Sequence, residues 1–212
     1  MINKKDVESI HPPNVGWLEY KLTNQQRDYV WKCIENKKEG VKHNLAGNIT
    51  GSYLLKDRGD WFWGNVLSPL RELYIETFDN RGEIYPLNQQ HPYYLQNWWV
   101  NYQKQNEFNP LHSHSGVYSF VIWMKIPTDY EEQEKNPIAS QTRSDDISNF
   151  QVQYVTIMGE PRSFTYRMSP KVEGVMLFFP SKLSHTVYPF YNCDEDRISV
   201  SGNILINTAR RL

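Results

Sequence analysis

The pattern of apolar and polar positions changes in kind near residue 91. Before that point, the segment from Thr23 to Gly40 carries apolar residues at helical spacing, and Thr23 and Gln26 have the spacing of a capping box. This pattern predicts a surface helix with one buried stripe. A second helix is predicted to begin at Ser68 and Pro69, since proline is favoured in the first turn. Its expected apolar face consists of Leu70, Leu73, Tyr74 and Phe78.

After residue 91 the chain consists of short runs rich in β-branched and aromatic residues, separated by Pro, Gly, Asn and Ser. The predicted strands are 93–102, 115–126, 150–158, 162–168, 174–179, 185–189 and 197–207. Many short strands without alternating helices predict an antiparallel sandwich or barrel, and a double-sheet jelly roll fits their number and length. We expect a mainly β single domain over residues 1–212, in which the helical and mixed N-terminal part (1–90) supports a β core (91–212).

One polar stretch, from Pro127 to Asn149, is too long for an ordinary hairpin. It contains the charged run EEQEK and the turn-forming pair Asn136 and Pro137. Two interpretations stay open for it. It is either a solvated insertion or a lid over a site.

Composition and charge restrict the class of protein. With 39% apolar and 14% aromatic residues, a chain of 212 residues can bury a sizeable core. The formal net charge of −1 and the lack of a like-charge block indicate neither a nucleic-acid nor a membrane partner. Cys33 and Cys193 are too few for a disulfide framework, and the start MINKKDVESIHPP lacks the apolar stretch of a signal peptide. We therefore expect a cytoplasmic protein, with no apolar run near the roughly 20 residues that span a bilayer.

Two of the six histidines stand one residue apart in NPLHSHSGVYSF, directly before a predicted strand. In an extended segment, His112 and His114 project from one face about 6.8 Å apart, so they can converge on one ion. Gly116 would share that face and leave room beside the ion. Imidazole suits iron, zinc, copper and nickel, so the pair alone names no metal. The alternative is a polar strand start with ordinary, satisfied histidines.

A third histidine, His185, opens a predicted strand 71 residues after His114. It could reach the same ion only if the sheet folds back on itself, as it does in a jelly roll. Arg197 follows 12 residues later, across the polar turn YNCDED. We therefore expect His185 and Arg197 on neighbouring antiparallel strands, about 5 Å apart and in nearly matching register.

The last predicted strand has one apolar and one polar face. The apolar face holds Ile198, Val200, Ile204 and Ile206, and the polar face holds Arg197, Ser199, Ser201 and Asn203. Such a strand borders either water or a polar cavity. Arg197 presents a planar fork that matches a carboxylate, and Ser199 adds a hydroxyl on the same side. The simpler alternative is a surface ion pair of Arg197 with Asp194 or Glu195.

His-x-His, a distant histidine and Arg-x-Ser a dozen residues later together resemble the Fe(II)- and 2-oxoglutarate-dependent oxygenase superfamily. More closely, NPLHSHSGVYSFVIWMKIP and FFPSKLSHTVYPFYNCDEDRISVSGNI resemble the 2-oxoglutarate/Fe(II) oxygenases carried by phages of marine cyanobacteria. The resemblance covers residues 93–207 and does not extend to residues 1–90. It implies a double-stranded β-helix, a jelly-roll or cupin-like core, and a phage-encoded enzyme that acts in the host cell.

The resemblance also implies roles for the histidines. His112 corresponds to the first iron ligand and His185 to the distal one. The chain departs from the usual motif at His114, where the superfamily has Asp or Glu. Three neutral ligands would leave Fe(II) with a higher net charge. Either the site is a three-histidine iron centre or its third ligand comes from elsewhere.

The cosubstrate residues follow from the same resemblance. Arg197 corresponds to the clamp on the C5 carboxylate of 2-oxoglutarate, and Ser199 to its helper. Tyr102 stands ten residues before His112, where prolyl-hydroxylase-like members place a tyrosine that binds the cosubstrate. Asn101, on the opposite strand face, is the competing choice.

The implied activity uses Fe(II), 2-oxoglutarate and O2, forms succinate and CO2, and hydroxylates a small molecule or a protein side chain. Two other enzymes with three-histidine sites remain as alternatives: a carbonic-anhydrase-like zinc enzyme and a cupin-type dioxygenase that does not use 2-oxoglutarate. Neither gives a role to Arg197 and Ser199. A non-catalytic jelly-roll module is the third alternative, with Trp98, Trp99 and Tyr102 stacking a ligand.

Overall fold

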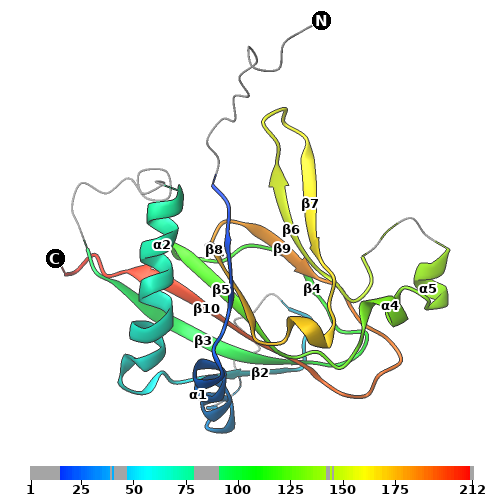
Figure 1. The fold of residues 1–212 in the computed structure, drawn as a ribbon, viewed down its shortest axis with the longest axis horizontal. Helices are drawn as coiled ribbons and strands as arrows, with labels where there is room; N and C mark the ends of the chain where they lie inside the picture. Colours follow the sequence, from blue (N-terminus) through cyan, green and yellow to red (C-terminus); the bar gives the residue numbers. More distant parts are fainter. Residues whose placement is uncertain are drawn as a thin grey trace, which may run out of the picture.

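A computed structural model of the chain describes residues 15–38, 40, 47–78, 91–141, 144 and 146–210. The described strands form two antiparallel sheets (Figure 1). The larger sheet has the order β1 (Leu18–Lys21), β8 (Val175–Pro180), β5 (Tyr118–Lys125), β10 (Arg197–Ile206), β3 (Tyr93–Gln103), β2 (Gly51–Leu54). The smaller sheet has the order β4 (Asn109–His112), β9 (Ser184–Val187), β6 (Phe150–Val155), β7 (Pro161–Tyr166).

The molecule is built in three layers, with the larger sheet in the middle. Helices α1 (Asn24–Glu35) and α2 (Ser68–Phe78) cover one face of this sheet, where Phe120 belongs to the same core cluster as residues of both helices. On the other face, Trp123 packs with residues of the smaller sheet in a second cluster. Alternate residues of β5 therefore serve two cores. The mainly β, jelly-roll fold predicted from the strand pattern is confirmed.

The first helix begins as predicted. The Thr23 side chain accepts a hydrogen bond from the Gln26 backbone, and the Gln26 side chain accepts one from the Thr23 backbone, which completes the capping box. The helix ends earlier than predicted, at Glu35 rather than near Gly40. The Asn36 side chain donates to a carbonyl of the last turn, and the chain then turns towards β2.

The second helix, α2, begins at Ser68 as predicted, but the helical turns directly before it were not predicted. A 3-10 turn (Arg58–Asp60) and a π-helical stretch (Trp63–Leu67) run directly into α2. The Asp57 carboxylate accepts hydrogen bonds from two backbone N–H groups of the first helical turn. The predicted apolar face is correct for Leu70 and Tyr74, but Leu73 is 48% exposed.

The N-terminal part contributes more than helices to the fold. Strand β1 pairs with β8 and β2 pairs with β3, so both edges of the larger sheet come from residues before 91. Neither strand was predicted, because each has only four residues, which is too short for a pattern to stand out. Across the described residues, we find no helix with the length and apolar character needed to cross a membrane.

The two ends of the Pro127–Asn149 stretch are packed, whereas its described middle, residues 131–144, is mostly exposed. The solvated-insertion interpretation therefore holds for the middle and is wrong for the ends. The stretch contains two short helices, α4 (Tyr130–Gln133) and α5 (Pro137–Ser140). Tyr130 and Gln133 are buried, and the Gln133 amide forms two hydrogen bonds with the backbone of Tyr191. The lid interpretation also gains no support, because none of the described residues of the stretch lines the cavity between the two sheets that holds the histidines.

The crossing between β9 and β10 differs from the hairpin that we expected. Strand β9 pairs with β4 and β6 in the smaller sheet, whereas β10 lies between β3 and β5 in the larger one. His185 and Arg197 are therefore not on neighbouring strands. The intervening residues cross from one sheet to the other, as jelly-roll connections do, and a short 3-10 turn (Pro170–Val172) precedes β8 in a similar crossing.

Candidate active site

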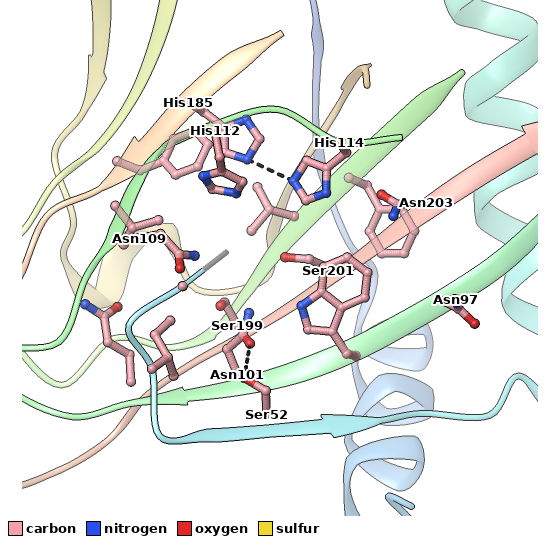
Figure 2. A pocket seen from close by; sticks show the side chains of 18 of the residues that line it. Ser52, Asn97, Asn101, Asn109, His112, His114, His185, Ser199, Ser201 and Asn203 are labelled. Atoms are coloured by element: carbon pink, nitrogen blue, oxygen red, sulfur yellow. Dashed lines mark hydrogen bonds between the residues drawn. The ribbon is translucent and has the colours of Figure 1, made fainter. Parts of the chain in front are cut away.

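A cavity of about 470 Å³ lies between the two sheets. Histidines at the ends of β4 and β9 form one wall, and alternate residues of β10 and β3 form the other (Figure 2). The polar face predicted for the last strand does border a cavity, which is lined by Arg197, Ser199, Ser201 and Asn203. Val200 and Ile204, on the opposite face, belong to the core beneath the helices.

Strand pairing brings two of the histidines together. His112 is the last residue of β4 and stands directly opposite His185 of β9 in the antiparallel register. His114 lies just beyond β4, where its backbone N–H donates to the carbonyl of Ser181 at 2.8 Å. The strand expected from residue 115 begins only at Tyr118, so His112 and His114 do not share a regular strand. Their side chains nevertheless converge.

The three imidazoles present nitrogen atoms to one point. One ligand atom from each of His112, His114 and His185 lies within 4.8 Å of the other two. The Nδ1 atoms of His112 and His185 lie 2.7 and 2.9 Å from the carbonyls of Pro110 and Leu183. A carbonyl only accepts, so each Nδ1 carries the proton and each Nε2 has a lone pair. The Nε2 atom of His185 lies at hydrogen-bond distance, 3.1 Å, from the Nε2 atom of His114 (Figure 2).

Burial keeps these histidines neutral. Desolvation lowers the pKa of His114 to about 4 and that of His185 to about 3, and it also lowers the pKa of His112. The neighbouring histidines act in the same direction for His114 and His185. Neutral imidazole is the form that binds metal ions, so no proton has to be removed at neutral pH.

Gly116 does not leave room beside the histidines as we expected. It has a φ of +100°, and a Cβ atom there would lie 2.8 Å from the carbonyl oxygen of Ile204. The residue is therefore needed for a left-handed turn that packs against β10. Its role is to turn the chain from His114 into β5.

Arg197 is held at the closed end of the cavity. The side chain is only 2% exposed, and its Nη2 donates to the backbone oxygen and the hydroxyl of Ser148 at 2.8 and 2.7 Å. Nη1 reaches the Tyr188 carbonyl at 3.5 Å, and the guanidinium lies over the ring of Phe190. These contacts fix the plane of the guanidinium.

The charge of Arg197 is not balanced by a side chain. Lys125 pairs with Glu195, Asp194 accepts from Gln105, and no carboxylate of the described chain lies within ion-pair distance of Arg197. The surface ion pair is therefore ruled out. The buried Nε atom also has no hydrogen-bond partner among the described residues. Desolvation lowers the pKa of Arg197 to about 9, which still leaves it charged at neutral pH.

The structure does not bring Tyr102 to this cavity, which corrects the expectation drawn from its position before His112. Tyr102 lies on the core side of β3, edge-to-face with Tyr53. Asn101, on the opposite face, is buried and lines the cavity. Its Oδ1 accepts from the Ser52 hydroxyl at 2.7 Å, which leaves the Nδ2 group for the cavity (Figure 2).

The sequence pattern missed two residues at the site, Ser148 and Ser52. Each contacts its functional neighbour across 49 residues of sequence. Ser52 stands on the unpredicted strand β2, and Ser148 lies in a stretch that reads only as polar loop. No local signal in the sequence could have singled out either residue.

Comparisons with known proteins give one matching family model and several structures of similar fold. A family model described as "Putative 2OG-Fe(II) oxygenase" matches residues 97–203, half of the chain. The structure is similar to a prolyl-4-hydroxylase from Pseudomonas putida, with a TM-score of 0.51 and 16% identity over 89% of this chain and 91% of that one. It is also similar to the 2OG complex of the viral collagen prolyl hydroxylase vCPH from Paramecium bursaria Chlorella virus-1. That match has a TM-score of 0.50 and 10% identity over 89% and 94% of the two chains. At these identities the two structures show the fold alone, and the curated proteins give no match.

Proposed function

The chain belongs to the 2OG-Fe(II) oxygenase family whose model it matches, and from this premise we propose that it hydroxylates a second, separately bound substrate. It is a 2-oxoglutarate-dependent, non-haem iron oxygenase that uses Fe(II), 2-oxoglutarate and O2. In the proposed reaction, 2-oxoglutarate and O2 are converted to succinate and CO2 while the substrate gains a hydroxyl group. The substrate is a small molecule or a protein side chain.

The histidine cluster fits an iron site. His112, His114 and His185 would hold Fe(II) through neutral nitrogen atoms, a donor type that suits this metal. The backbone carbonyls that accept from Nδ1 of His112 and His185 orient both rings before any ion arrives. With His114 in place of a carboxylate, the protein supplies no negative charge, so the carboxylates of the cosubstrate would balance the ion.

The other wall of the cavity fits 2-oxoglutarate. Arg197 would pair with the C5 carboxylate through its unpartnered Nε edge, and Ser199 would add a hydroxyl to the same group. Asn101 replaces Tyr102 as the nearby donor, because its Nδ2 group faces the cavity. A buried charge without a counter-ion is costly, so an anionic ligand at Arg197 would stabilise the site as well as bind there.

The protein residues contribute positioning rather than bond making. Iron held by His112, His114 and His185 would supply the oxidising chemistry together with 2-oxoglutarate and O2. Arg197 and Ser199 would position the C5 carboxylate of 2-oxoglutarate on β10. The three histidines would position the iron on the opposite wall, so the two walls together would orient the cosubstrate. The buried walls around His185 and Arg197 limit access of water to the reacting groups.

One observation carries this proposal: three convergent imidazoles and a buried, unpaired guanidinium face the same cavity. The decisive test is anaerobic addition of Fe(II) and 2-oxoglutarate to the metal-free protein, followed by absorption spectroscopy. We expect a weak visible charge-transfer band that requires both components. A zinc enzyme or a cupin-type dioxygenase would give no band that depends on 2-oxoglutarate, and such a result would overturn the proposal.

A further inference from the structure

The wall formed by β10 and β3 changes character along its length. Arg197 stands opposite Gln103 and Asn203 stands opposite Asn97, and the two pairs are separated by about 20 Å at the usual rise of a strand. The Arg197 end is closed, whereas Asn97 is exposed at the other end. The cosubstrate proposed above would occupy the closed end and the middle. A substrate must therefore meet the residues of the open end.

The amide of Asn203 has a fixed orientation at this open end. The Ser119 hydroxyl donates to Asn203 Oδ1 at 2.9 Å, and its oxygen lies 3.1 Å from the hydroxyl of the buried Ser181. Because Ser119 has a single proton, Ser181 donates to Ser119, and the chain of hydrogen bonds has one direction. The Nδ2 group of Asn203 is left for the cavity, so the open end offers a donor (Figure 2).

The described residues that line the open end of the cavity carry no charge. Of the described residues that line the cavity, only Arg197 carries a charge at neutral pH, and none is an Asp, Glu or Lys. Trp99, which is 6% exposed, adds an apolar wall with its ring 6.0 Å from that of His114. An ammonium group would find no counter-ion among the described lining residues. A carboxylate would find only neutral donors among them, since the exposed Lys182, whose Nζ donates to the His114 carbonyl at 3.3 Å, lies outside the lining.

We infer that the substrate is uncharged where it enters the cavity and presents an amide carbonyl oxygen to Asn203. This inference rests on the proposed function, because it assigns the rest of the cavity to iron and 2-oxoglutarate. The carbonyl accepts from Nδ2 of Asn203, and the adjoining carbon chain lies along Trp99 towards the histidine cluster. The same chemistry is present in a small carboxamide and in a peptide.

The test compares three probes with the same carbon chain: butanamide, butanoate and butylammonium. Each is titrated into the protein loaded with 2-oxoglutarate and with Zn(II) as a redox-inert ion, and binding is followed by ligand-observed saturation-transfer NMR. We expect butanamide to bind at least 10-fold more tightly than either charged probe. The capped peptide acetyl-alanyl-alaninamide separates the two sources: tighter binding than butanamide indicates a polypeptide substrate, and equal binding indicates a small amide.

The variant Asn203→Asp reverses the chemistry of the open end with little change of shape. It should weaken butanamide at least 10-fold, strengthen butylammonium, and leave the affinity for 2-oxoglutarate within twofold. Asn24→Asp makes the same change of charge at the start of α1 and should alter none of these values. If Asn203→Asp fails to fold, Asn97→Asp places the charge on the partner strand.

Preferential binding of butanoate or butylammonium to the parent protein would overturn the inference, as would an unchanged probe preference in the Asp variant. Failure of the protein to take up the ion and 2-oxoglutarate together would instead overturn the proposed function. The two failures are therefore distinguishable in one series of titrations.

Discussion

The two walls of the cavity are held in place in different ways. On the histidine wall, His112 and His185 are each oriented by a carbonyl two residues earlier in the chain. On the opposite wall, Arg197 is oriented by Ser148, which lies 49 residues away. The rings of His112 and His185 are thus oriented by local contacts, whereas the Arg197 guanidinium is oriented by a long-range one. A local support moves with its side chain, whereas a distant one depends on the packing of a separate segment.

Removal of a histidine should have the largest effect and should leave the fold intact. Alanine at His112, His114 or His185 deletes one of three convergent nitrogen atoms, so Fe(II) affinity should fall by more than about 100-fold, beyond what loss of a supporting residue costs. Metal content after equilibrium dialysis measures this, with thermal melting as the check on folding. His91→Ala, outside the cavity, is the control. If His114→Ala binds iron as tightly as the parent, the three-histidine centre is wrong.

Changes at Arg197 should separate the two walls. Arg197→Ala removes a charge-assisted hydrogen bond of about 1.5–3 kcal/mol, so roughly 10- to 150-fold more 2-oxoglutarate should be needed. Arg197→Lys keeps the charge without the planar fork and should lie between alanine and the parent. Calorimetric titration of 2-oxoglutarate into Fe(II)-loaded protein under nitrogen measures both. Iron affinity without cosubstrate should not change, and equal 2-oxoglutarate affinities in all three proteins would remove Arg197 from the site.

Ser148 tests the long-range support itself. Ser148→Ala removes one hydrogen bond to Arg197, worth about 1 kcal/mol, so 2-oxoglutarate affinity should fall roughly 5-fold without loss of iron binding. Ser148 has a φ of 61°, so Ser148→Gly relieves backbone strain while it removes the same hydroxyl. Equal losses in the two variants assign the effect to the hydroxyl. A loss in alanine alone would assign it to the backbone instead.

The smallest effect should come from the residue that the family resemblance favoured on β3. Tyr102→Phe should leave 2-oxoglutarate affinity unchanged within about twofold, because the hydroxyl lies on the core side of the sheet. Asn101→Ala, one residue away on the cavity face, should weaken the binding of 2-oxoglutarate by about 1 kcal/mol, the free energy of one neutral hydrogen bond. The same calorimetric titration serves for both. The reverse order of effects would restore Tyr102 as the cosubstrate residue.

How far the site could be predicted follows from the same contrast. The histidine spacing and the alternation in β10 are local patterns that can be recognised in the sequence. The residues selected from them all line one cavity: His112, His114, His185, Arg197 and Ser199. The choice of Tyr102 failed because it came from counting residues back from His112, which does not fix the face of a strand. A shift of one residue turns every side chain to the other face.

The fold divides in the same way. The capping box of Thr23 and Gln26 predicts the first helix, and it can be recognised in the sequence because the two residues are only three positions apart. Asp57 caps the second helix without any such pattern, and the edge strands β1 and β2 exist only because β8 and β3 pair with them. The crossing from β9 to β10 was predicted as a hairpin because a polar turn between two strands looks alike in either case. Only packing of the two sheets distinguishes them.

The position of β10 has a consequence for folding during synthesis on the ribosome. This strand is the last in the described chain, yet it fills the gap between β3 and β5 in the middle of the larger sheet. Until it emerges from the exit tunnel, those two strands have unpaired inner edges, which are sites for misassociation. The nascent protein would therefore need protection until β10 has left the exit tunnel. A chain released from a ribosome that stalls before Arg197 would lack β10. Its exposed strand edges would then be recognised by chaperones and proteases.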